Sequence, residues 1–153
     1  MWTKTKSLTL SRILAAAMTG MTMITTFFVP SMCRWYENVS VGSGFFGDSG
    51  IFLPMCICLY ICECLALTAM WGLHVLLRNI SRGDVFTERN TLCLRIISWA
   101  CMMAGVVFAV FGMWRFIFFL PAFFAVMFGL IMRVLKNVFE KAVEIKSEND
   151  FTI

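Results

Sequence analysis

Four long stretches of this chain contain almost no ionised side chains, and this pattern limits the fold more than any other feature of the sequence. They cover residues 13–29, 51–77, 94–113 and 116–135. About 20 consecutive apolar residues are enough for an α-helix to cross the hydrocarbon core of a bilayer. The pattern therefore predicts an all-α membrane protein with four transmembrane helices.

The composition supports this class. Hydrophobic residues make up 60% of the 153 residues and charged residues only 14%, whereas a soluble domain carries about 25% charged residues. So few charges cannot cover the surface of a water-soluble globule. The four spans leave an outer loop at 31–50, an inner loop at 78–93 and a tail at 136–153. We therefore expect a single membrane domain over residues 1–153.

The basic residues predict the orientation of the chain. Eleven of the 13 lie before the first span, between the second and third spans, or around the end of the fourth, and Arg34 and Arg115 lie on the other side. The eleven are Lys4, Lys6, Arg12, Arg78, Arg82, Arg89, Arg95, Arg133, Lys136, Lys141 and Lys146. The positive-inside rule then predicts a multi-pass protein of the plasma membrane with both termini and the inner loop in the cytoplasm.

The first span has an alternative interpretation. A basic start followed by an apolar run also describes a secretory signal peptide, and four threonines and Gly20 make this span the least hydrophobic of the four. We expect it to be a retained transmembrane helix.

The inner loop carries signals for helix ends. Gly83 can end the second helix, and Thr87 is placed to cap the third. Glu88 follows in the first turn, where a carboxylate complements the helix dipole. Between these signals lie two apolar residues, Val85 and Phe86. They either plug the helix ends or headgroup layer, which we favour, or form a docking point for a partner.

The fourth helix is predicted to continue beyond the membrane as an amphipathic cytoplasmic tail. Apolar residues recur at helical spacing on one face; they are Leu135, Val138, Phe139, Ala142, Val143 and Ile145. A row at i, i+4 spacing on the other side contains Lys136, Glu140, Glu144 and Glu148. This row is either a solvated face of a helix that packs on the inner loop or an acidic stripe for a basic partner.

Glu63 is the acidic residue nearest the middle of a span, and His74, the single histidine of the chain, lies near the inner end of the same span. Helical geometry places both on one polar stripe. A proton or cation path would need such spacing, but no second acid or base lies deep within the other spans. A buried, neutral Glu63 hydrogen-bonded to a neighbouring helix is the favoured alternative.

Other chemistries lack their motifs. Four cysteines in the segment CICLYICEC are spread around a helix, so they predict no metal site. We find no phosphate-binding glycine loop, nucleophile elbow or HExxH pattern, and therefore expect neither an enzyme nor a cofactor. The tail lacks a basic patch, which argues against direct binding of nucleic acid. Small residues at four-residue spacing, such as Ala16 and Gly20, fit either a packed bundle or a homo-oligomer.

Two cytoplasmic segments point to a family. The inner loop NISRGDVFTERNTLCLRIISWA and the C-terminus VFEKAVEIKSENDFTI resemble those of bacterial inner-membrane proteins grouped as domain of unknown function 2975. Phe151 stands where that family usually has Leu. Members of the family are commonly encoded beside a small helix-turn-helix regulator of the Cro/CI type.

The resemblance implies a membrane protein that holds or releases such a regulator. The implied partner-binding residues are Gly83, Asp84, Phe86, Thr87 and Asn90 in the loop, with Glu148, Asn149, Asp150, Thr152 and Ile153 in the tail. The alternative for both motifs is structural, in which they pack together and fix the cytoplasmic helix ends. The alternative function is a small transporter or channel component that uses Glu63 and His74.

Overall fold

The computed structural model describes residues 4–40, 44–46 and 50–150, and the regular structure within them is helical. The elements are α1 (Lys4–Val39), α2 (Phe52–Ser81), α3 (Glu88–Gly112), the short 3-10 helix η1 (Phe116–Phe118) and α4 (Phe119–Asp150). Each of the four α-helices contains an apolar stretch long enough to cross a membrane. The prediction of an all-helical protein with four helices able to span a bilayer is confirmed.

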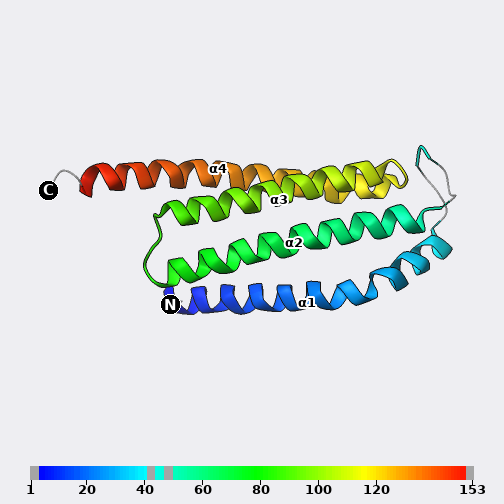
Figure 1. Ribbon diagram of the computed structural model, residues 1–153, viewed down its shortest axis with the longest axis horizontal. Helices are drawn as coiled ribbons and strands as arrows, with labels where there is room; N and C mark the ends of the chain where they lie inside the picture. The colour runs from blue at the N-terminus through cyan, green and yellow to red at the C-terminus, as the bar shows by residue number, and fades with distance from the viewer. Residues whose placement is uncertain (1–3, 41–43, 47–49, 151–153) are drawn as a thin grey trace.

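The helices form a row in chain order (Figure 1). Each helix packs against its neighbours in the chain, and within the described residues α1 and α4 make no contact. The start of α1, the α2–α3 loop and the last turns of α4 lie toward the same end of the helix axes (Figure 1). The fold therefore places the first and last helical turns on the side of the middle loop. That this end faces the cytoplasm remains the prediction from the basic residues.

Helix α1 is longer than its predicted span and includes half of the region that we expected to form the outer loop. It continues through Pro30 to Val39, and Figure 1 shows it curving toward the row in this second half. Beyond Pro30, Cys33 is fully buried and Tyr36 packs edge-on against the Phe118 ring, with centroids 6.2 Å apart. These contacts stabilise the helical turns that follow Pro30, although the proline itself removes one backbone hydrogen bond from the helix.

At the other end of the helices, where α3 turns into α4, an apolar core and a buried arginine join the elements. The core contains Val29, Cys33, Ile51, Met55, Cys58 and Phe111. Arg115, in the α3–α4 turn, is 2% exposed and donates to the Ser40 carbonyl and hydroxyl at 3.4 Å. The end of α1 is thus tied to the turn between α3 and α4, although the two helices that flank that turn lie farther along the row.

Glycines allow α3 and α4 to approach closely. A Cβ added to Gly129 would lie 3.1 Å from both the Met102 nitrogen and the Ser98 carbonyl oxygen, and one added to Gly105 would lie 3.1 Å from the Ala122 carbonyl. The Ser98 hydroxyl also donates to the Gly129 carbonyl at 2.7 Å. Small residues that bring helix backbones together are a typical device of membrane proteins. A Cβ added to Gly20, by contrast, would meet no atom within 4 Å.

We expect Gly129→Leu to lower the free energy of unfolding by about 1–3 kcal/mol, because the larger side chain must push α3 and α4 apart. Unfolding of the detergent-solubilised protein by sodium dodecyl sulfate measures this change. Gly20→Leu is the matched control, since it gains the same helix propensity without a clash. Equal stability of the two variants would contradict the close contact.

Candidate functional site

The α2–α3 loop begins with a turn that requires a glycine. The Gly83 N–H donates to the Ile80 carbonyl at 3.1 Å, and the Asp84 N–H donates to the Asn79 carbonyl at 3.2 Å. These two bonds form a Schellman motif, in which the residue after the C-cap adopts a left-handed conformation. Gly83 has φ +90°, a conformation that side chains disfavour. The predicted role of Gly83 at the end of the second helix is confirmed.

The other end of the loop is capped as predicted. Thr87 is extended at the N-cap of α3, and its hydroxyl accepts a hydrogen bond from the Asn90 N–H at 3.4 Å. Glu88 lies in the first turn of the helix. The first turn of α3 therefore has both a capping side chain and a favourable charge at its dipole.

Asn90 joins the two halves of the loop. It is 0% exposed, and its side-chain NH₂ donates to the Asp84 and Val85 carbonyls at 2.7 and 2.8 Å. Its Oδ1 accepts from the Asn79 side chain at 2.7 Å. A buried side-chain amide whose oxygen and nitrogen are both hydrogen-bonded fixes the path of the backbone around it. Asn90 is thus the central residue of the loop.

Phe86 links the loop to α4. Its ring lies 5.6 Å from the ring of Phe139, centroid to centroid, and Phe139 packs in turn on a buried cluster of α2 and α3. Phe86 remains 45% exposed. The contact supports the interpretation of this residue as a plug against the helix ends, while part of the ring stays open to solvent.

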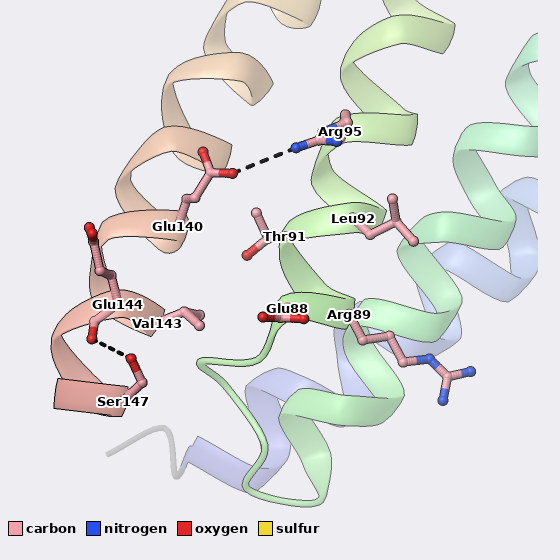
Figure 2. Close-up of a pocket in the computed structure, with 9 residues that line it drawn as sticks. All are labelled: Glu88, Arg89, Thr91, Leu92, Arg95, Glu140, Val143, Glu144 and Ser147. Atoms are coloured by element: carbon pink, nitrogen blue, oxygen red, sulfur yellow. Dashed lines mark hydrogen bonds and ion pairs between the residues drawn. The ribbon is translucent and has the colours of Figure 1, made fainter. Parts of the chain in front are cut away.

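An open groove lies beside this loop, between the start of α3 and the projecting part of α4 (Figure 2). Its volume is about 780 Å³, and its lining residues are Glu88, Arg89, Thr91, Leu92, Arg95, Glu140, Val143, Glu144 and Ser147. Figure 2 shows Val143 pointing toward α3 and Thr91 pointing toward α4. The groove combines a largely apolar lining, which includes Leu92 and Val143, with carboxylates on both helices.

The charges of the groove are partly paired. Arg95 of α3 lies 3.6 Å from the Glu140 carboxylate of α4, and Lys136 donates to the same carboxylate. The hydrogen bond from Lys136 is the main cause that lowers the pKa of Glu140, which lies beyond the predicted end of the fourth span. Lys141 pairs with Glu144 at 2.8 Å. Glu140 is therefore ionised at neutral pH, and the carboxylates of Glu140 and Glu144 remain about half exposed.

One comparison with known proteins identifies the family. A family model described as protein of unknown function (DUF2975) matches residues 43–153, more than two thirds of the chain. The chain belongs to the DUF2975 family. This confirms the resemblance noted in the inner loop and the C-terminus. Curated proteins and solved structures gave no match.

In this DUF2975 protein, the loop residues of the predicted partner site come together, and the tail residues are only partly described. Gly83, Asp84, Thr87 and Asn90 all contribute to one hydrogen-bonded loop, so each has a structural role. Glu148 is exposed near the end of α4. Asn149 and Asp150 belong to α4 by their backbone alone, and Thr152 and Ile153 lie outside the described residues.

The groove joins a residue that the sequence analysis did not select to two that it did. Arg95 was counted only as a basic residue, whereas Glu140 and Glu144 belong to the row offered as an acidic stripe for a basic partner. Their meeting depends on the register between α3 and α4, which the spacing along one helix does not give. The signal that could have revealed Arg95 was its position inside an apolar segment, where a charge needs a partner.

The two intramembrane polar residues lie between α1 and α2, and the matched family region begins after α1. Glu63 Oε1 accepts from the Thr25 hydroxyl at 2.9 Å, whereas its Oε2 is buried without a hydrogen-bond partner. His74 Nε2 lies 3.1 Å from the Thr19 hydroxyl. The predicted hydrogen bond between Glu63 and a neighbouring helix is confirmed, with Thr25 of α1 as the donor. The two residues contact separate threonines and do not contact each other.

Within residues 4–40, 44–46 and 50–150, we find no group of three or more His, Cys, Asp or Glu residues that could hold a metal ion. The seven cysteines are free thiols. The candidate site is the loop together with the groove beside it, because the capped backbone and the charged lining lie side by side there.

Asn90→Ala is expected to open the loop, because the Asn79 amide and the Asp84 and Val85 carbonyls lose their partner. Each buried group left unsatisfied costs about 1–3 kcal/mol. Limited digestion of the solubilised protein with trypsin should show faster cleavage after Arg82. Ser81→Ala is the control, since its exposed hydroxyl bonds only within its own turn. An unchanged cleavage rate in Asn90→Ala would contradict the central role of this residue.

Proposed function

We propose that this DUF2975 protein is a non-enzymatic membrane anchor that holds a small helix-turn-helix transcription regulator at the cytoplasmic end of α3 and α4. The observation that carries the proposal is the groove of about 780 Å³ between the two helices. It lies next to a rigid loop and along a helix that projects beyond the row (Figure 1). The four apolar helices provide the attachment to the bilayer.

The charges of the groove suit a basic partner. Regulators of this class carry Lys and Arg residues that neutralise DNA phosphates. Glu88, Glu140 and Glu144 line the groove from both helices and offer carboxylates to such a surface. Val143 supplies apolar contact between them. A regulator bound here would have part of its DNA-reading surface covered, so that membrane binding and DNA binding would exclude each other.

Arg95 adds a positive charge on the α3 side of the groove, and Figure 2 shows it pointing toward α4, whereas the Arg89 side chain extends away from α4. Charges at the rim of an interface select the partner and its orientation more than they add affinity. The preferred partner therefore presents basic residues toward α4 and an acidic or neutral edge toward Arg95.

A photo-crosslinking residue in place of Val143 should capture the regulator in cells of the source organism. The expected product contains a helix-turn-helix protein, disappears in a Glu144→Lys background and is displaced by duplex DNA carrying its operator. Mass spectrometry of the crosslinked band identifies the partner. The matched control is the same residue in place of Val138, which is 59% exposed on the same helix and does not line the groove.

A companion variant separates the groove from the end of the tail. Deleting residues 146–153 removes Glu148 and the residues after it but keeps Glu140, Val143 and Glu144. If the tail end contributes binding residues, as the family resemblance implies, crosslinking at Val143 weakens while membrane insertion is unchanged. No product at Val143, or an equal product at Val138, would refute the anchor function.

A second function has one observation in its favour. The Glu63 carboxylate has a buried oxygen without a hydrogen-bond partner, and an intramembrane acid of this kind is typical of proton and cation pathways. A transport role predicts that the protein in proteoliposomes carries a proton or cation flux that Glu63→Gln abolishes. Thr68→Ala, which changes an exposed threonine of the same helix that bonds within its own turn, should leave it unchanged. Equal fluxes with and without the protein would exclude this role.

A further inference from the structure

A second opening lies in the interface between α3 and α4, which we call the α3–α4 seam. Its lining residues are more basic than those of the groove. Its volume is about 290 Å³, and it is lined by Arg95, Ser98, Trp99, Arg133, Lys136 and Asn137. Arg95 lines both openings, and the other five residues belong to this one alone. Three basic side chains therefore surround a small space between two helices.

The basic groups of this opening are held in place and are not fully neutralised. The Arg133 guanidinium lies over the Trp99 ring, 5.0 Å from its centroid, and such a contact orients a cation. The Lys136 side chain is only 15% exposed. Glu140 pairs with both Arg95 and Lys136, so one carboxylate faces three cations. The remaining positive charge favours an anion.

The depth of the opening indicates which anion. Trp99 and Arg133 lie within the apolar stretches 94–113 and 116–135, close to the ends that meet the loop and the tail. Tryptophan and arginine at such positions are typical of the headgroup layer. Trp99 is half exposed, so it faces the surroundings of the row and not its interior. The anion most abundant at this depth is the phosphate of a lipid.

The surface next to the opening suits an acyl chain. One helical turn further into the span from Trp99, Met103 is 48% exposed, and Leu130 is 49% exposed one turn from Arg133. Residues three or four apart share a helix face. An apolar surface therefore continues from the basic opening toward the middle of the span, as a phospholipid with its headgroup at Arg133 would need.

We propose that this opening binds the phosphate of an anionic phospholipid such as phosphatidylglycerol. Arg133 and Lys136 contact the phosphate, Arg95 contributes a third positive charge, and Trp99 contacts the glycerol backbone. A zwitterionic lipid is disfavoured because its ammonium group meets the same cations. Basic pockets between transmembrane helices are known to recognise anionic headgroups in this way. The proposal does not depend on the regulator, since a lipid here leaves Val143 and Glu144 free.

Native mass spectrometry of the full-length protein with equal amounts of phosphatidylglycerol and phosphatidylcholine tests the site. The wild-type protein should retain phosphatidylglycerol preferentially. The double variant Arg133→Gln, Lys136→Gln should bind it roughly 30-fold more weakly, because each basic side chain near the headgroup contributes about a fivefold step. The control Arg78→Gln, Arg82→Gln removes the same charge from exposed positions outside the opening and should keep the preference.

Three outcomes would overturn the proposal. Equal retention of the two lipids by the wild-type protein would exclude an anionic site. Unchanged affinity in the Arg133 and Lys136 variant, with helicity by circular dichroism equal to wild type, would exclude these residues. Displacement of the lipid by an excess of inorganic phosphate would show a site for a free anion. If the double variant does not fold, Trp99→Leu takes its place and should weaken lipid retention without changing the net charge.

Discussion

The close contact between α3 and α4 is the constraint on which the rest of the structure depends. Gly105 and Gly129 bring the two backbones together, and the Ser98 hydroxyl bridges them through the Gly129 carbonyl. This contact sets the register between the helices. The register in turn places Arg95 opposite Glu140 and Arg133 beside Trp99. Both openings of the seam follow from a contact made by residues with no charge and almost no side chain.

The α2–α3 loop and the α3–α4 seam differ in the interactions that their polar side chains make. The loop is held by hydrogen bonds around Asn90, which is buried and whose amide is fully used. Near the loop, the exposed ion pair between Arg95 and Glu140 joins α3 to α4, whereas Glu144 pairs with Lys141 within α4. Exposed pairs of this kind are individually weak and screened by salt, so a rigid loop lies beside carboxylates that stay about half exposed. This combination suits recognition of a charged ligand without a rearrangement of the fold.

The sequence predicted features that depend on local rules. The number of apolar stretches, the turn at Gly83 and the cap at Thr87 each follow from a few neighbouring residues, and the structure contains all of them. Features that depend on the register between helices were not predictable in this way. The pairing of Arg95 with Glu140 and of Glu63 with Thr25 joins residues that are far apart in the chain. The extension of α1 past Pro30 also depends on tertiary packing, because buried Cys33 lies beyond the proline.

The length of α4 has a mechanical consequence. A helix rises 1.5 Å per residue, so the part of α4 between Gly129 and Glu148 extends about 28 Å, and the part between Phe119 and Gly129 about 15 Å. The contact at Gly129 thus divides α4 into two unequal parts, and Gly105 holds the shorter part through Ala122 and Val126. A rotation of the whole helix about Gly129 would displace its C-terminal tip about twice as far as its N-terminal end. The longer part carries Glu140, Val143 and Glu144, so the groove lies on the part of the helix that such a rotation moves most.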